Sequence, residues 1–226
     1  MTDHRFNWHK EAEQQWDMRS NFWNQNSKDM WDSGNRSTII PLIGKHMNPQ
    51  ARLLDVGCGD GYGAYKLSAL GFEVVGVDIS AEMVKKAKQN QSNRLSFVQG
   101  DVVNLPFESD TFDGIMVINA LEWTEDPFKG LRELHRIAKK DARIFIGILG
   151  PAAGPRTNSF PRLIGEPTIC NTMMPWELEQ LALELDLKVI DGMGVYDAQV
   201  DQFEIDQLPK RLKQALTFMW VSVLKK

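Results

Sequence analysis

The chain has 226 residues, of which 42% are hydrophobic and 25% are charged, as is ordinary for a soluble globular protein. Its net charge of −4 argues against nucleic acid as a partner. The two cysteines form neither a disulfide framework nor a metal-ligand pattern, so we expect no metal and a cytoplasmic location. No stretch resembles a signal peptide or approaches the ~18 apolar residues of a membrane span, so we expect no membrane association.

Tryptophan is concentrated near the N-terminus. Four of the seven tryptophans fall in the first 31 residues, at Trp8, Trp16, Trp23 and Trp31. Trp16, Trp23 and Met30 recur every seven residues, a spacing typical of an amphipathic helix. We expect one or two helices that pack on the main body. Their aromatic side chains either complete the core or form a wall over a substrate pocket, and both interpretations can hold.

From residue 50 onward, short apolar runs alternate with helical segments, which predicts a parallel sheet covered on both faces. Strands are expected at 52–56, 73–78, 95–101, 114–120 and 143–150, and helices at 62–70, 80–90 and 127–139. Ser80 and Asp126 are placed to cap two of these helices, the second with Pro127 at its first position. Residues 104–110 show no helical pattern, so we expect a short or distorted third crossover.

The pattern changes after residue 150. Residues 150–175 contain five prolines and are expected to form a long loop, for which a functional lid is our hypothesis. A helix is expected at 176–185, a strand at 187–195 and a short helix at 210–216. The terminal run TFMWVSVLKK is typical of a last strand.

The most informative motif is LLDVGCGDGYGAYKLSALG, over residues 53–71. Glycine occupies every second position from 57 to 63, behind an apolar run that ends in an acid. A strand, a glycine-rich turn and a helix in succession present backbone N–H groups and allow a ligand to approach the backbone closely. The motif therefore predicts a ligand-binding turn.

An acid accompanies each of the first three predicted strands, at Asp55, Asp78 and Asp101. Asp78 lies 21 residues beyond Gly57, a spacing at which a carboxylate can accept hydrogen bonds from ribose hydroxyls. Asp101, one strand further, is placed to meet the exocyclic amine of an adenine. The three acids predict an adenosine-containing ligand, the alternative being that each only caps the helix that follows.

Short motifs leave the kind of adenosine ligand open. No phosphate-binding Gly-x-x-x-x-Gly-Lys-Ser/Thr string is present, and the dinucleotide fingerprint Gly-x-Gly-x-x-Gly is matched only in part. A nicotinamide oxidoreductase is an alternative because Tyr62 and Lys66 match the Tyr-x-x-x-Lys signature of such enzymes. The pair falls in the glycine-rich turn, however, away from where that chemistry is expected.

Four stretches together resemble class I S-adenosylmethionine-dependent methyltransferases: the glycine-rich motif, VVGVDIS, FVQGDVVNLPFESDTFDGIMVINALEWTEDP and LRELHRIAKKDARIFIGI. They are most similar to the small-molecule branch that includes the ubiquinone and menaquinone biosynthesis methyltransferases. The resemblance implies a Rossmann-like α/β fold, with a doubly wound seven-stranded sheet, mostly parallel, whose last strand is antiparallel. We expect one domain over 1–226, with N-terminal lid helices (1–45), a cofactor-binding core (50–150) and a lid loop with C-terminal strands (151–226).

The resemblance also implies contacts with the methionine part of S-adenosylmethionine. Asp55, Gly57 and Gly59 would lie against it. Asn119 would offer its backbone carbonyl to the ammonium group. Arg36 is placed to meet the carboxylate.

The same resemblance implies contacts with the adenosine part. Asp78 would accept hydrogen bonds from the ribose hydroxyls, and Ile79 would pack on the adenine. Asp101 would bind the adenine amine, and the backbone N–H of Val102 a ring nitrogen.

The acceptor side departs from the family pattern, which often has histidine where this chain has LEWTEDP. Glu122 is either a general base or a loop acid, and Trp123 either stacks on a planar substrate or is structural. Motifs for amine and cytosine acceptors are absent, so we expect O- or C-methylation of a small molecule by a monomer or homodimer. A protein that binds S-adenosylmethionine without turnover is a further alternative.

Overall fold

The computed structural model describes residues 6–197, 200 and 202–226. They form a seven-stranded sheet in the order β3-β2-β1-β4-β5-β7-β6. The strands are β1 (Arg52–Val56), β2 (Glu73–Asp78), β3 (Leu95–Gln99), β4 (Phe112–Ile118), β5 (Ala138–Leu149), β6 (Lys188–Val195) and β7 (Met219–Lys225). Only β7 among them runs antiparallel to its neighbours, β5 and β6. The predicted fold class is confirmed.

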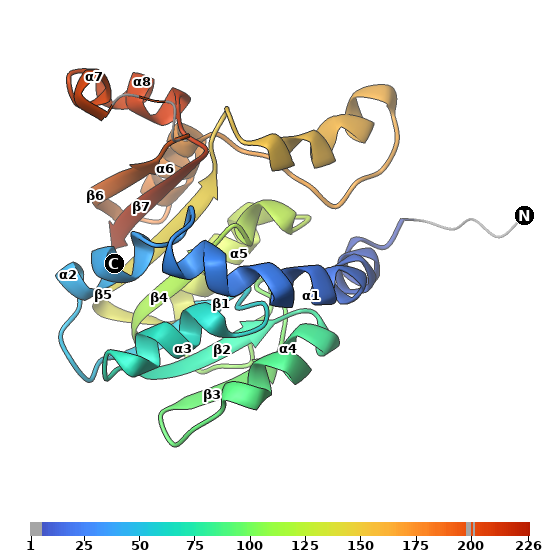
Figure 1. Cartoon of the computed structure of the whole chain (residues 1–226), viewed down its shortest axis with the longest axis vertical. Coiled ribbons are helices and arrows are strands. Elements are labelled where there is room, and N and C mark those ends of the chain that lie inside the picture. The colour runs from blue at the N-terminus through green and yellow to red at the C-terminus, as the bar shows by residue number, and fades with distance from the viewer. Residues whose placement is uncertain (1–5, 198–199, 201) are drawn as a thin grey trace, which may run out of the picture.

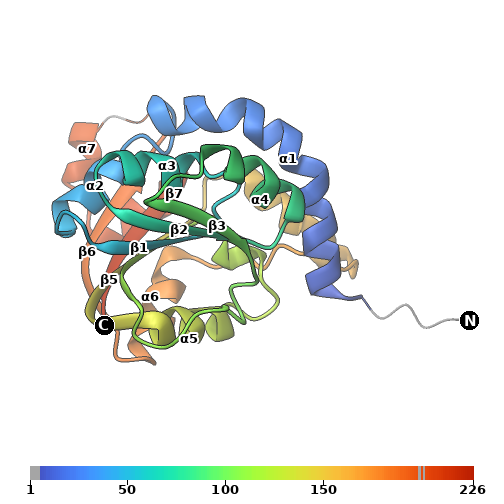
Figure 2. The same ribbon diagram turned by 90° about the horizontal axis from the view of Figure 1, so that it is seen from below.

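Helices cover both faces of the sheet (Figure 2). One face carries α1 (Trp8–Asp32), α2 (Ile39–His46), α3 (Tyr62–Ala69) and α4 (Ala81–Ala87), and the other α5 (Pro127–Ile137) and α6 (Pro175–Leu183). Each face has its own apolar core, represented by Ile43 and Leu67 on the first and Leu131 and Leu178 on the second. Burial on both faces explains why the central strands are nearly continuous apolar runs.

The N-terminal segment forms a single long helix. Asn7 caps α1 by accepting a hydrogen bond from Lys10 N at 3.0 Å. The helix packs against α3 and α4 and lies across the body of the molecule (Figure 1). Of the described helices, none is long and apolar enough to cross a membrane.

The predicted caps are confirmed. Ser80 Oγ accepts a hydrogen bond from Met83 N, and Asp126 Oδ1 accepts one from Lys129 N, with Pro127 in the first turn. As predicted, no helix bridges β3 and β4, because residues 100–111 form only turns and a bridge. A single helical turn, η1 (Lys88–Asn90), extends α4.

The segment after β5 differs from the predicted loop, because much of it is the 3₁₀ helix η3 (Gly154–Ile164). Three side chains in its first turns, those of Thr157, Asn158 and Ser159, donate to carbonyls three residues back. These bonds stabilise the tight i to i+3 winding, and sequence periodicity alone does not reveal them. The short helices α7 (Gln202–Asp206) and α8 (Lys210–Ala215) complete the chain before β7.

Candidate functional site

The glycine-rich turn joins β1 to α3 at the carboxyl edge of the sheet. Gly57, Gly59 and Gly61 all have positive φ, a conformation that side chains disfavour. A Cβ on Gly57 would overlap that of Ala120 and one on Gly61 would overlap the Phe97 ring, whereas one on Gly59 would make only an ordinary contact with Trp23. The turn therefore needs glycine both for its backbone conformation and for space.

Asp78, at the end of β2, ties this turn to the sheet. Its Oδ2 accepts a hydrogen bond from Gly59 N at 2.8 Å, and its Oδ1 accepts one from Ser80 N at 2.9 Å. Burial raises the pKa of this carboxyl to about 6. Each carboxylate oxygen keeps a further lone pair, so the group can still accept hydrogen bonds from a ligand.

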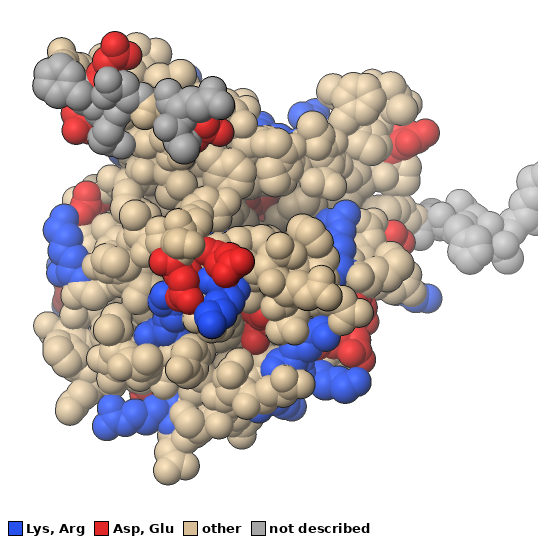
Figure 3. All heavy atoms as spheres, viewed as in Figure 1, with Lys and Arg blue, Asp and Glu red and all other residues tan. Residues whose placement is uncertain are grey.

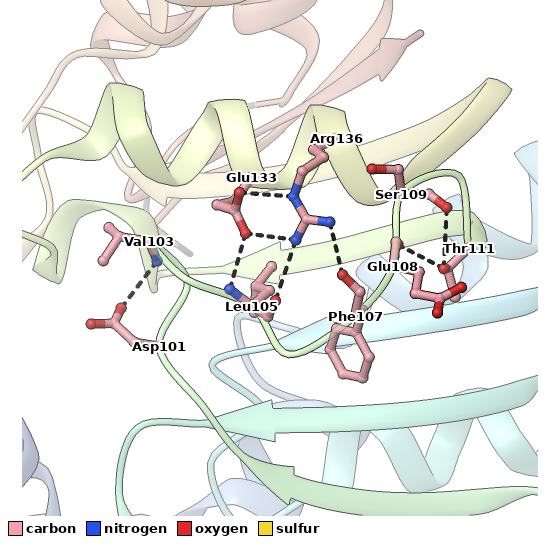
Figure 4. Close-up of polar contacts among 9 residues, drawn as sticks. All are labelled: Asp101, Val103, Leu105, Phe107, Glu108, Ser109, Thr111, Glu133 and Arg136. Atoms are coloured by element: carbon pink, nitrogen blue, oxygen red, sulfur yellow. Dashed lines mark hydrogen bonds and ion pairs between the residues drawn. The ribbon is translucent and has the colours of Figure 1, made fainter.

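Asp101 follows β3, and α5 holds the loop a few residues beyond it, at Leu105 and Phe107. Arg136 Nη1 donates to Phe107 O at 2.8 Å and Nη2 to Leu105 O at 3.2 Å, while Glu133 accepts from Leu105 N (Figure 4). These bonds fix an irregular loop that has no helix of its own.

The Asp101 carboxylate is partnered on both oxygens. Oδ1 accepts from Val103 N at 3.1 Å, and Oδ2 lies 2.7 Å from His9 Nδ1 on α1. His9 thus brings the start of α1 to the tip of β3. No pattern in the sequence indicates this pair, because its members are 92 residues apart.

Arg36, between α1 and α2, is a half-buried cation. Its guanidinium carbon lies 4.9 Å from the centre of the Trp23 ring and 5.5 Å from that of Trp31. Burial lowers the pKa of Arg36 to about 10. Nearby carboxylates, Asp55 foremost, raise this pKa and so offset part of the effect of burial. Its guanidinium donates to no described residue, so its N–H groups are available to an anion.

Asp55 lies under the turn, close to Arg36. Burial raises the pKa of its carboxyl to about 7, and Oδ2 has no hydrogen-bond partner among the described residues. An unsatisfied buried carboxylate oxygen is costly, and a bound donor would remove this cost.

These residues surround one cavity. Of the predicted site residues, the structure brings nine to its wall: Arg36, Gly57, Gly59, Asp78, Ile79, Asp101, Val102, Asn119 and Trp123. Asp55 and Glu122 are not on the wall; they lie buried behind it. The roles of all eleven stay predictions.

Glu122 belongs to the short helix η2 (Leu121–Trp123) and is 1% exposed. Its Oε1 accepts from Leu149 N at 3.0 Å and from Asn119 Nδ2 at 3.3 Å, whereas Oε2 has no partner among the described residues. Burial raises the pKa of the carboxyl. In this geometry Glu122 orients Asn119, whose φ of 52° is unusual for a residue other than glycine.

α1 supplies the aromatic wall of the cavity. Trp8, Trp16, Trp23 and Trp31 all line it, and Trp31 also fills the space above Gly63 in α3. The tryptophans thus complete packing and face the cavity, as both interpretations of their pattern expected.

Several polar residues of the wall have no counterpart among the predicted site residues, and two of them bind other wall residues or α1. One is His9, and the other is Asp60, which accepts from Ser27 Oγ at 2.5 Å and Asn24 Nδ2 at 3.1 Å on α1. No residue of the predicted lid loop lines the cavity.

The cavity suits a ligand with a nucleoside at one end and a carboxylate at the other. Asp78 and Asp101 offer acceptors and Arg36 offers donors on the wall of the same cavity, beside apolar side chains. The backbone of that turn can approach a ligand closely because no side chain covers it. The donor set contains no group of three or more potential metal ligands among the described residues.

The comparisons with known proteins agree with this geometry. Residues 54–146 match the family model described as "Methyltransferase domain". The predicted resemblance to class I methyltransferases is confirmed.

The curated relatives include a demethylmenaquinone methyltransferase from Clavibacter sepedonicus, 32% identical over 119 residues. The match covers 52% of this chain and 46% of that protein, so the chain spans only about half of that relative's length.

Solved structures show the same fold. A chain in the complex between the Haloferax volcanii Trm112 methyltransferase activator and a methyltransferase has a TM-score of 0.69 at 21% identity, covering 93% of this chain and 96% of that one. The 4+2 cyclase SpnF has a TM-score of 0.65 at 18% identity, covering 86% and 81%. Identities this low support the fold alone, and a cyclase among the neighbours shows that the fold hosts more than one reaction.

Proposed function

We propose that this protein is an S-adenosylmethionine-dependent methyltransferase that methylates an O or C atom of a small molecule. The observation that carries the proposal is the convergence of Asp78, Asp101 and Arg36 on one cavity around the glycine-rich turn. These groups match in chemistry the ribose, adenine and carboxylate of that cofactor, and Asp78 and Asp101 lie at or just past the ends of neighbouring strands. The methyltransferase domain match and the curated relatives support the same conclusion.

In this proposal, different residues bind different parts of the cofactor. Asp78 would hold the ribose hydroxyls, while Ile79, Asp101 and the N–H of Val102 would hold the adenine. The backbone of Gly57 and Gly59 would lie against the methionine part.

Charged and polar groups on the other side would bind the amino-acid end. Arg36 would pair with the carboxylate, and the Asn119 carbonyl would accept from the ammonium group. Asp55 would lie beneath this end of the cofactor, where its Oδ2 can accept a hydrogen bond and its carboxylate attracts the Arg36 guanidinium.

The bound cofactor supplies an activated methyl group on a sulfonium. The protein's contribution is then to align the acceptor with that group and to exclude water, which α1 and its tryptophans would do. Trp123, on the cavity wall, is the candidate to stack on the acceptor. Glu122 stays the candidate base if the acceptor must lose a proton, but its carboxyl lies buried behind the cavity wall, so it would have to move to reach the acceptor.

The oxidoreductase alternative loses its main support. Tyr62 Oη donates to Asp32 Oδ2 at 3.0 Å and Lys66 Nζ to Asp32 Oδ1 at 2.5 Å, and neither residue lines the cavity. The pair binds the end of α1 to α3.

Two experiments test the proposal. Thermal-shift measurements with S-adenosylmethionine, S-adenosylhomocysteine, NAD and NADP should show stabilisation by the first two only. Stabilisation by a dinucleotide alone would end the methyltransferase hypothesis. Incubation with radiolabelled methyl donor and cell extract should then yield a labelled small molecule, whereas a bound cofactor without any labelled product would favour a non-catalytic binding protein.

A further inference from the structure

The carboxylate of Asp101 is held by partners on two different elements. Its Oδ1 accepts from Val103 N at 3.1 Å, within the loop that follows β3 (Figure 4). Its Oδ2 lies 2.7 Å from Nδ1 of His9, in the first turn of α1. A carboxylate only accepts hydrogen bonds, so His9 Nδ1 is the donor.

These two bonds determine how the carboxylate faces the cavity. The last torsion of an aspartate side chain has broad minima, so the partners of the two oxygens set the plane of the carboxylate. Val103 fixes one oxygen, and His9 fixes the other. Each oxygen keeps a further lone pair, with which it can accept a hydrogen bond from a ligand.

His9 is the one basic side chain that contacts this carboxylate in the described part of the chain. Arg36 and Lys129, the other cations of the cavity wall, form no ion pair with Asp101 there. Replacing His9 by alanine would therefore leave Oδ2 without a protein donor, and the carboxylate could turn about its last torsion.

Other contacts hold α1 on the body of the molecule. Trp8 Nε1, in the same turn as His9, donates to Trp123 O at 2.8 Å. Two turns further along, Asp17 Oδ1 accepts from Ser80 Oγ at 2.5 Å. α1 lies on the outside of the molecule, with a hollow between it and the arm that η3 forms (Figure 3). The His9 side chain is 58% exposed, so its replacement should leave the fold intact.

We propose that His9 is a positioning residue for the base of the cofactor: it holds the Asp101 carboxylate so that this group accepts from the adenine amine. The first turn of α1 thereby takes part in selecting a purine that carries a 6-amino group. His9 and Asp101 both line the cavity, where the base is proposed to bind. This inference rests on the proposed function and adds a residue that determines which base is bound.

Calorimetry of the whole protein with two ligands tests the proposal. One ligand is S-adenosylhomocysteine, and the other is its analogue in which hydrogen replaces the 6-amino group. The wild type should bind S-adenosylhomocysteine at least about tenfold more tightly, because the analogue leaves a charged acceptor unpaired.

The variant H9A should bind S-adenosylhomocysteine about three- to tenfold more weakly than the wild type does, because its Asp101 carboxylate is no longer fixed. Its affinity for the analogue should be little changed, since the analogue has no amine for Asp101 to accept. The ratio of the two affinities should therefore fall.

Two further variants separate this role from the attachment of α1. H9N should restore the ratio, since asparagine Nδ2 follows Cγ as histidine Nδ1 does and can donate to the same oxygen. W8F is the matched control in the same turn, because it removes the donor to Trp123 O and leaves His9 in place. A looser α1 should weaken binding of both ligands alike, so W8F should keep the ratio of the wild type.

The same ratio in H9A as in the wild type would overturn the inference, even if both affinities fall, because His9 would then only attach α1. Failure of H9N to restore the ratio would overturn it as well, since the hydrogen bond would not be what matters. Both results leave the proposed function intact. A wild type that binds neither ligand contradicts the proposed function itself, and the inference with it.

Discussion

A few residues at the carboxyl edge of the sheet hold conformations that their neighbours impose. Gly57 has a φ of 69°, and its N–H donates to Val77 O at 2.8 Å. Ala120 leaves no room for a side chain there. The turn can therefore take this position only because Gly57 has no Cβ.

Replacing Gly57 by alanine should destabilise the protein more than the same change at Gly71. Both glycines have positive φ, which costs an alanine about 1–2 kcal/mol. A Cβ at Gly71 meets nothing within 4 Å, whereas one at Gly57 overlaps Ala120, for which we expect a further ~1–3 kcal/mol. Urea unfolding of G57A and G71A measures the difference, and equal losses would show that the turn tolerates the added atom.

Asp55 should make stability depend on pH near neutrality. Its folded pKa of about 7 exceeds the ordinary value of 3.8, so between these values the folded state binds more protons than the unfolded state. The free energy of unfolding should therefore fall as pH rises through this window, by up to about 1.4 kcal/mol per pH unit for this group. Asp78 acts in the same direction up to about pH 6.

The variant Asp55→Asn removes this titration. Urea unfolding at about pH 5 and about pH 7 should show a smaller loss in D55N than in the wild type. Carboxyls with lowered pKa, such as Asp191 at about 2, act at lower pH and do not interfere. Identical pH dependence in the two proteins would mean that Asp55 is not protonated in this range.

At the scale of elements, two helices from opposite faces of the sheet complete the cavity. α1 closes it with aromatic side chains and ties its first turn to Asp101 through His9. α5 holds the loop that carries Asp101 through Glu133 and Arg136 (Figure 4). The tip of β3 is thus fixed from both sides, although no helix follows β3 itself.

Arg136→Lys should weaken binding of S-adenosylmethionine about two- to tenfold, because a lysine cannot donate to both Leu105 O and Phe107 O from one planar group. R132K, the same change elsewhere on α5, is the control. Calorimetric dissociation constants give the comparison, with far-ultraviolet circular dichroism to verify the fold. Equal affinities in the two variants would contradict the claim that Arg136 of α5 positions the loop that carries Asp101.

At the scale of the molecule, the sequence predicted most of what local chemistry determines. The apolar runs predicted all seven strands, although β5 begins at Ala138, before the predicted run, and β6 has no buried residue. The parallel pairing of β2 with β3 then brings the ends of both strands, and with them Asp78 and Asp101, to the same edge of the sheet. No further sequence motif is needed to predict this. Ser80 and Asp126 were predictable as caps because their partners lie three residues away.

Features that depend on contacts distant in sequence could not be predicted in this way. The pairing of His9 with Asp101 joins the first helix to the third strand. The placement of Glu122 behind the cavity wall depends on Leu149, at the end of another strand. η3 is a different case, because local hydrogen bonds form it where prolines predicted a loop, and hydrophobic periodicity does not reveal such bonds.

The most direct test of the account is calorimetric titration of S-adenosylmethionine into the wild type, D78N and D101N, with D110N as control. Asp110 is an exposed acid paired with Lys226, and its change to asparagine should leave binding unaltered. We predict saturable binding to the wild type and at least about tenfold weaker binding to D78N and D101N, because each loses a charged acceptor in the cavity. No binding to the wild type, or equal affinity in all four proteins, would contradict the claim that these two carboxylates hold the cofactor.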